Sequence, residues 1–77
     1  GEMPEDIAEV SVPAGSLAQV LKAAGLTPST SDALRMIDGG GVRINGEKVG
    51  DRATALSAGD SVVLQVGKRK FARVTLI

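Results

Sequence analysis

The dipeptide Asn45-Gly46 constrains the fold of this chain more than any other sequence feature. It lies at the centre of the run VRINGEKV, residues 42–49, and Asn-Gly is the preferred pair for a two-residue type I′ turn between antiparallel strands. A two-residue turn fixes the strand register, because the residues on either side of it must pair in order. Val42 is therefore expected opposite Val49, on the face of the hairpin that turns toward a core.

The other face of the same hairpin carries two cations. The register places Arg43 directly opposite Lys48, and like charges in that position destabilise a strand pair. Water tolerates such a pair, but the arrangement makes better sense if an anion binds between the two side chains.

Two serine-led segments that end in glycine precede the hairpin. Ser16 opens a Ser-x-x-Gln capping box, and apolar residues at helical spacing follow it as far as Gly25, which predicts a helix over residues 17–24. Ser29 opens a second helix, which the glycines of residues 39–41 end. Two short helices joined by a tight turn form a helical hairpin.

Two further strands are expected after a polar loop over residues 50–59. They are SVVLQV, residues 61–66, and FARVTLI, residues 71–77. Val62, Leu64 and Val66 face one way on the first strand, and Ala72, Val74 and Leu76 face one way on the second. Their apolar stripes reach the same face only if the connecting loop has an odd number of residues or a bulge. We therefore expect an unusual backbone conformation at Gly67.

The chain is expected to hold one domain. Residues 1–12 are interpreted as the end of a linker, with a short edge strand left open for the alternating residues before Pro13, and residues 13–77 as the domain itself. The fold class is α+β: a small single domain in which a helical hairpin packs on a short, mostly antiparallel sheet.

The composition excludes several kinds of function. The chain has no Cys and no His, which removes disulfides, thiolate nucleophiles and the usual zinc ligands. No carboxylates are paired at a catalytic spacing, so we predict no catalytic residue, no metal site and no enzyme activity. The Gly41-x-x-x-x-Gly46 spacing lacks the Lys-Ser/Thr of a phosphate-binding loop. Without Cys, with an acidic start and with no apolar run near the ~18 residues that span a bilayer, the chain is expected to be cytoplasmic.

The charges divide unevenly along a chain that is formally neutral. Residues 1–32 hold five acids and one cation, whereas residues 33–77 hold eight cations and four acids. Four of those cations and the only aromatic residue, Phe71, fall within VGKRKFARV, residues 66–74. Because charges are screened over roughly 8 to 10 Å at ordinary salt, a ligand at the second half meets a basic surface. The neutral total is poor evidence against a nucleic-acid partner.

Cations from three predicted elements form the candidate binding site. Each one alone is most simply a solvated surface group, but a compact domain could bring them onto one side, as a phosphate backbone requires. A single aromatic argues against the multi-base stacking platforms of some RNA-binding sheets, and Phe71 is interpreted as a core residue in preference to a stacking residue. The alternative is a protein-interaction domain that docks on an acidic partner surface.

The ordered string LxxVLKAAGLTPSTSDALRMIDGGGVRINGEKVGD resembles the S-four type RNA-binding domain family, which is named after a ribosomal small-subunit protein. The flanking runs MPEDIAEVSVP and VGKRKFARV are similar to the C-terminal domain of bacterial tyrosyl-tRNA synthetases. The resemblance implies a non-catalytic module that grips tyrosine tRNA near its long variable arm and acts in protein synthesis. Its partners would be tRNA and the rest of the synthetase, and the isolated domain would be monomeric.

The resemblance also implies where cofactors and RNA are held. ATP and tyrosine belong to a separate catalytic domain, so no cofactor is expected in this chain. The family's RNA contacts fall by position on one set of residues: Ser29, Ser31, Arg35, Arg43, Asn45, Lys48, Lys68, Arg69 and Lys70. The chain departs from the family at Leu34, where a second Arg is usual. An S-four domain of a ribosomal, heat-shock or pseudouridine synthase protein is the alternative within the family, and the GKRKF ending argues against it.

Overall fold

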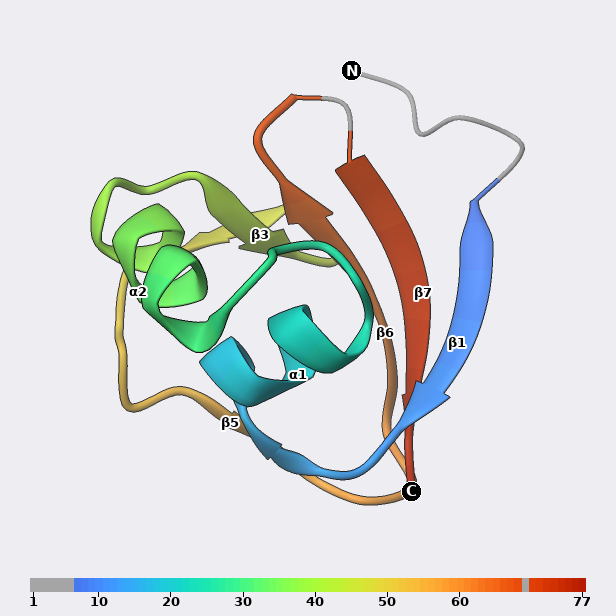
Figure 1. Cartoon of the computed structure of the whole chain (residues 1–77). Coiled ribbons are helices and arrows are strands. Elements are labelled where there is room, and N and C mark those ends of the chain that lie inside the picture. The colour runs from blue at the N-terminus through green and yellow to red at the C-terminus, as the bar shows by residue number, and fades with distance from the viewer. Residues whose placement is uncertain (1–6, 69) are drawn as a thin grey trace.

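The main sheet has five strands in the order β1-β7-β6-β3-β4, and both helices lie on one of its faces (Figure 1). The structure is a computed structural model that describes residues 7–68 and 70–77. Only β1 and β7 are parallel, and the other neighbouring strands are antiparallel. The predicted α+β fold is therefore confirmed. The strand bounds are β1 Ala8–Val12, β3 Val42–Ile44, β4 Glu47–Val49, β6 Ser61–Val66 and β7 Lys70–Leu76.

Both helices begin at the predicted serine caps. Helix α1 spans Leu17–Ala23 and α2 spans Thr30–Asp38. The Ser16 hydroxyl accepts the backbone N–H of Gln19 at 3.3 Å, and the Ser29 hydroxyl accepts that of Asp32 at 3.2 Å. Each bond satisfies a backbone donor that the first turn of a helix leaves without a partner.

Both helices also end as predicted, in turns that fold back on the helix. The N–H of Leu26 donates to the carbonyl of Leu21 at 3.0 Å, and the N–H of Gly41 donates to that of Met36 at 2.8 Å. These are the six-to-one bonds of the Schellman motif, which satisfy carbonyls that have no partner inside the helix. The turn after α2 leads directly into β3, so it sets where the hairpin starts.

The β3–β4 hairpin has the predicted turn and register. Asn45 and Gly46 both have positive φ, 51° and 87°, as a type I′ turn requires. Val42 pairs with Val49 and Arg43 with Lys48.

The β6–β7 hairpin confirms the odd-numbered loop. Leu64 pairs with Ala72, and Val66 pairs with Lys70, so three positions separate the paired ends. Gly67 has a φ of 68°, a left-handed conformation that glycine adopts without steric cost. As a result, the apolar stripes of the two strands share one face.

The loop over residues 50–59 is not wholly irregular, and this part of the prediction was wrong. Ala55–Leu56 forms strand β5, which pairs with β2, Gly15–Ser16, in a separate two-stranded sheet. The N–H of Leu17 extends this pairing by donating to the carbonyl of Thr54 at 2.9 Å. Leu56 packs against the core, which holds the loop against the start of α1. Two residues are too few to show an alternating pattern in the sequence.

The edge strand that the sequence left open is present as β1. It runs parallel to β7, with Val10 opposite Val74 and Val12 opposite Leu76. Val12 is buried in the core, so residues 8–12 form part of the sheet that the domain is built on. Residues 1–6 of the predicted linker lie outside the described residues.

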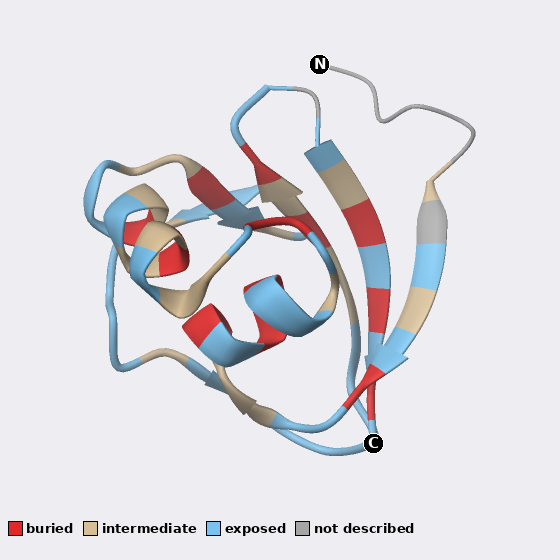
Figure 2. Cartoon of the chain, viewed as in Figure 1, coloured by how far each residue is buried: buried red, intermediate tan, exposed pale blue. Residues whose placement is uncertain are grey.

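The core lies between the helices and the sheet, and buried residues occur on both helices and on β3, β6 and β7 (Figure 2). Leu34, the departure from the family pattern, is partly buried and packs against this same core. Its side chain therefore supports the domain's own packing. The largest fully buried side chains are Leu17, Val20, Leu21, Ile37, Val42, Leu64, Val74 and Leu76. Within the described residues, no helix is long and apolar enough to cross a membrane.

Candidate RNA-binding surface

The outer face of α2 presents two of the predicted contact residues. Ser31 and Arg35 are both exposed and lie four residues apart, whereas Ala33 and Ile37 are buried on the opposite side of the helix. Residues at this spacing neighbour each other along one helix face. A ligand that lies along α2 can therefore meet the Ser31 hydroxyl and the Arg35 guanidinium together.

Ser29 and Asn45 also have structural roles. The Ser29 hydroxyl, which caps α2, in addition donates to Asp32 Oδ2 at 3.3 Å. Asn45 Oδ1 accepts the backbone N–H of Val63 at 2.9 Å, and the Asn45 N–H donates to the Val63 carbonyl at 2.8 Å. Asn45 thus continues the β3–β6 ladder around the turn. An RNA contact at either residue would share a group that already holds the fold.

Arg43 and Lys48 lie side by side on the face of the sheet away from the helices. Both are exposed and directly paired, while Val42 is buried and Ile44 packs on the core side. The predicted like-charge pair is therefore confirmed.

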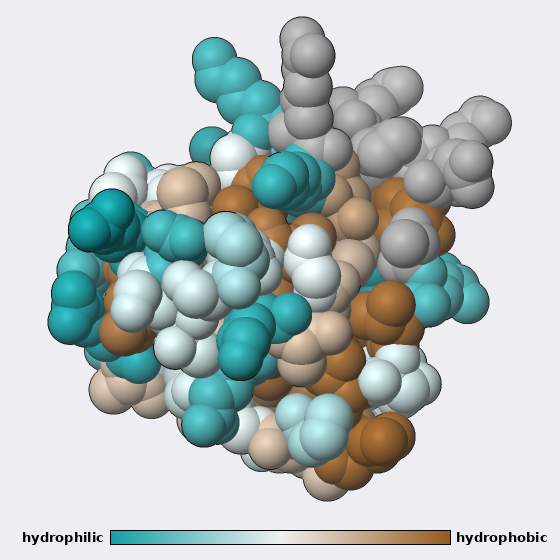
Figure 3. All heavy atoms as spheres, viewed as in Figure 1, coloured by the Kyte–Doolittle hydropathy of each residue, from teal (hydrophilic) through white to brown (hydrophobic). Residues whose placement is uncertain are grey.

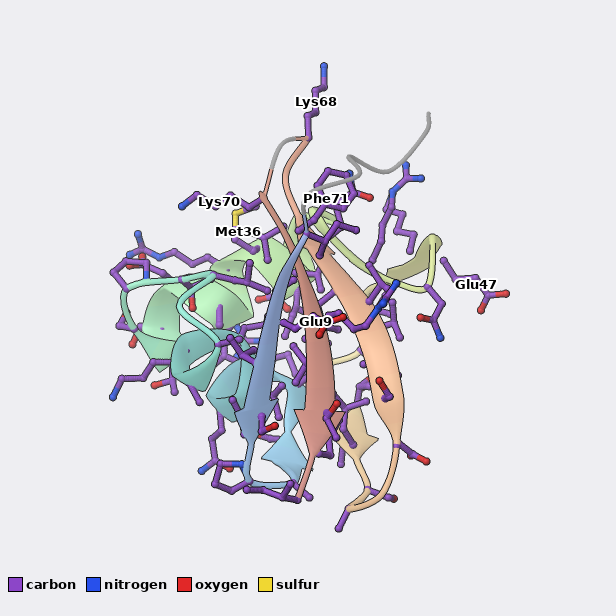
Figure 4. All side chains as sticks on the ribbon, turned by 90° about the vertical axis from the view of Figure 1, so that its right-hand side faces the viewer. Glu9, Met36, Glu47, Lys68, Lys70 and Phe71 are labelled. Atoms are coloured by element: carbon purple, nitrogen blue, oxygen red, sulfur yellow. The ribbon has the colours of Figure 1, made fainter. Side chains whose placement is uncertain are left out.

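The end of α2, the hairpin and the β6–β7 tip meet at one end of the domain. The N–H of Gly67 donates to the carbonyl of Gly41 at 2.8 Å, which ties the tip to the turn after α2. The side chain of Lys48 lies over Gly40 in that turn. Lys68 projects from the tip beyond the sheet (Figure 4). Arg69 lies outside the described residues.

Lys70 and Phe71 lie on opposite sides of β7 (Figure 4). Lys70 points to the helix side, as Ala72 does, and Phe71 points to the open side, in register with Gln65. The interpretation of Phe71 as a core residue was wrong, because strand alternation with the buried Ala72 turns it outward. Strand alternation also divides the cations between the two sides of the sheet, although they gather at one end of the domain. We had expected them on one side.

Ion pairing separates the cations into two groups. Arg52 pairs with Asp38, and Arg73 Nη1 lies 3.2 Å from Glu9 Oε1. Among the described residues, no carboxylate pairs with any of the other cations. That unpaired group contains every predicted RNA contact that is charged and described, together with Lys22: Lys22, Arg35, Arg43, Lys48, Lys68 and Lys70.

The Asp38–Arg52 pair offsets a negative charge at the end of α2. Asp38 is the last residue of α2, where the carbonyl end of the helix dipole disfavours an anion. The Arg52 guanidinium contacts both carboxylate oxygens, with its Nε 2.8 Å from Oδ1. These hydrogen bonds lower the pKa of Asp38 below its usual value, and the pairing raises that of Arg52.

Hydrophilic residues gather over α2 and toward the end where the tip lies, on the face seen in Figure 3, and hydrophobic residues gather on the β1 side. Gln65 is the residue near this end that the sequence did not single out. It pairs with both Arg43 and Phe71. Its position depends on the β3–β6 pairing, for which the local sequence carries no signal.

The chain belongs to the S4 domain family, whose model matches residues 16–62. The helical hairpin and the Asn-Gly turn are features on which the resemblance rested, and that resemblance is confirmed.

More particularly, the chain is similar along its whole length to tyrosine–tRNA ligases. It is 55% identical to that of Nitrosospira multiformis and 56% identical to that of Aromatoleum aromaticum, in each case over 99% of this chain and 20% of the ligase. The ligase of Shewanella oneidensis is 55% identical over 100% of this chain and 20% of its own length. The chain thus spans about one fifth of the length of these relatives.

Proposed function

We propose that this chain is the C-terminal tRNA-binding part of a tyrosine–tRNA ligase. The observation that carries the proposal is the group of cations, other than Lys22, for which the described residues supply no carboxylate partner. These cations come from α2, the β3–β4 hairpin and the β6–β7 tip, which meet at one end of the domain. Several separated positive charges of this kind suit a nucleic-acid backbone, because its phosphates carry negative charge at regular intervals. Membership of the S4 family and similarity to ligases that act on tRNA support this choice.

In this proposal the domain contributes binding and no chemistry. Arg35 and Lys70 on the helix side, Arg43 and Lys48 on the open side, and Lys68 between them would neutralise phosphates on a backbone that passes around the tip. Such contacts fix the position of the RNA and carry little sequence information. The long variable arm of tyrosine tRNA is the proposed region of contact, and ATP and tyrosine would bind in the catalytic part of the ligase.

The test is the salt dependence of tRNA binding. If the cations engage four or five phosphates, the logarithm of the binding constant should fall against the logarithm of the salt concentration with a slope of about −3 to −4. A tRNA with a short variable arm should bind more weakly than one with a long arm. A flat salt dependence would contradict the proposal, as would equal binding to heparin and to both tRNAs.

Three variants locate the contact. Replacing Lys68, Arg69 and Lys70 by Ala should weaken tRNA binding and leave the circular dichroism spectrum unchanged. Lys22→Ala is the control for the single variant Lys68→Ala, because each removes one exposed lysine. Lys22 lies on α1 beside Pro13 and Ala14, which follow the end of β1 that pairs with Leu76, so it is at the other end of the sheet. Equal effects of the two single variants would show that only total charge matters.

A further inference from the structure

Four side chains form a straight row across the open face of the sheet, one from each of four adjacent strands. The row begins at Lys48 on β4, continues through Arg43 and Gln65, and ends at Phe71 on β7, and every neighbouring pair is in register. With strands about 4.8 Å apart, the row is about 14 Å long. No described element covers this face, because both helices lie on the other one (Figure 1).

Phe71 is the unusual member of this row. It is the only aromatic residue of the chain, and it is half-buried on the open face, while the core-facing positions of the same strand hold Ala72, Val74 and Leu76. A single exposed apolar residue is ordinary on a protein surface. The row also holds an amide and two cations that have no carboxylate partner among the described residues. A ring, an amide and two cations together suit a nucleotide.

The neighbours of Phe71 offer the other contacts that a nucleotide needs. Gln65 Nε2 donates to the carbonyl of Gly67 at 3.0 Å, which holds the amide toward the tip and leaves its oxygen to accept a bond from a base. Arg43 follows in the row, exposed and without a described carboxylate partner. Arg73 in the next row is already paired with Glu9. The order of groups along the row is thus ring, amide and cation.

We infer that the open face binds one unpaired RNA nucleotide, whose base stacks on Phe71 while Gln65 contacts the base edge and Arg43 with Lys48 contact the phosphates. The inference rests on the proposed function, since it specifies which part of the RNA the open face binds. One aromatic side chain supports one stacked base, whereas the sheets of multi-base platforms carry two or three. An anion between Arg43 and Lys48 also relieves their repulsion.

A docking surface for protein is the competing interpretation of this face. It fits less well, because burial of Arg43 and Lys48 in a protein interface requires paired carboxylates to offset the loss of hydration. A flexible RNA strand supplies negative charge through its phosphates and planar bases for stacking in the same molecule. Any of the four bases can stack on an aromatic ring.

Single-stranded and fully paired RNA distinguish stacking from charge. We expect Phe71→Leu to weaken binding of an oligoadenylate of about ten nucleotides by about 5- to 150-fold, the usual range for one base on an aromatic ring. Binding of a duplex without unpaired bases should not change. Phe71→Tyr should restore the affinity. Thr75→Ala, an exposed residue on the same face of β7, is the matched control and should leave both affinities unchanged.

A tryptophan at the same position gives a readout other than affinity. The chain contains no Trp, so Phe71→Trp introduces a single fluorophore, which a stacked base should quench. Heparin should bind without quenching. If Phe71→Leu binds oligoadenylate as the unchanged chain does, or if the fluorescence of the Phe71→Trp variant responds equally to heparin, the inference is wrong, and the salt-dependent binding of tRNA still stands. If the unchanged chain binds no RNA at low salt, both the proposed function and this inference are wrong.

Discussion

The two faces of the main sheet differ in what the same two strands contribute to them. Toward the helices, β6 and β7 present Leu64, Ala72 and Val74, all buried. Toward the open side they present Gln65, Phe71 and Arg73, which are exposed or half-buried. One step along a strand thus separates a side chain that is buried in the core from one that faces the open side. Changes on the two faces should therefore have separable effects, on stability and on affinity.

The largest expected effect is on the helix-covered face. Leu64 is fully buried, and truncation of a buried Leu to Ala generally costs about 2 to 5 kcal/mol. A domain of this size has a total stability of about 4 to 12 kcal/mol. We expect Leu64→Ala to lower the free energy of unfolding by about 2 to 5 kcal/mol, measured by urea denaturation and circular dichroism. Gln65→Ala is its neighbour on the open face and should change the value by no more than about 0.5 kcal/mol.

A smaller effect, on binding alone, is expected on the open face. The double variant Arg43→Ala/Lys48→Ala should reduce the salt slope of tRNA binding by about 2, since each lost phosphate contact accounts for about 0.9. Stability should stay the same or rise slightly, because the two cations repel each other across the hairpin. The control is Glu9→Ala/Arg73→Ala, which removes a paired cation and anion from the same face. A clear loss of stability in the first variant would mean that the two faces are not separable.

Much of the fold could be predicted because its signals are local. The caps at Ser16 and Ser29 and the turn at Asn45-Gly46 each depend on the chemistry of a few neighbouring residues. The unusual backbone conformation of Gly67 could be predicted because the apolar stripes of the two strands reach one face only if the loop has an odd number of residues or a bulge. None of these features required knowledge of which distant segments pair.

The remaining features depend on pairings between distant segments. The pairing of β3 with β6 places Gln65 in the candidate site, and the packing of Leu56 creates β5, yet the local sequence specifies neither. The side on which Phe71 lies was available from alternation with Ala72. The interpretation of Phe71 as a core residue was wrong because it relied on the tendency of Phe to be buried. Here the alternation of side chains along β7 decides which way Phe71 points.

The smallest expected effect is at Asp38 and Arg52, which lie 14 residues apart and tie the end of α2 to the loop before β5. Because the pKa of Asp38 is lowered in the folded state, the pair stabilises the fold above the unfolded pKa of Asp38, and this contribution is lost as the pH falls through the folded value. Both side chains are well exposed, so solvent and salt screen the pair and the contribution is small. We expect Arg52→Ala to return the pKa of Asp38 toward its usual value in an NMR titration. Its small loss of stability should be present at neutral pH, absent at strongly acid pH, and smaller at high salt. A loss of equal size at both pH values would mean that the Arg52 side chain stabilises the loop by packing, with no contribution from its charge.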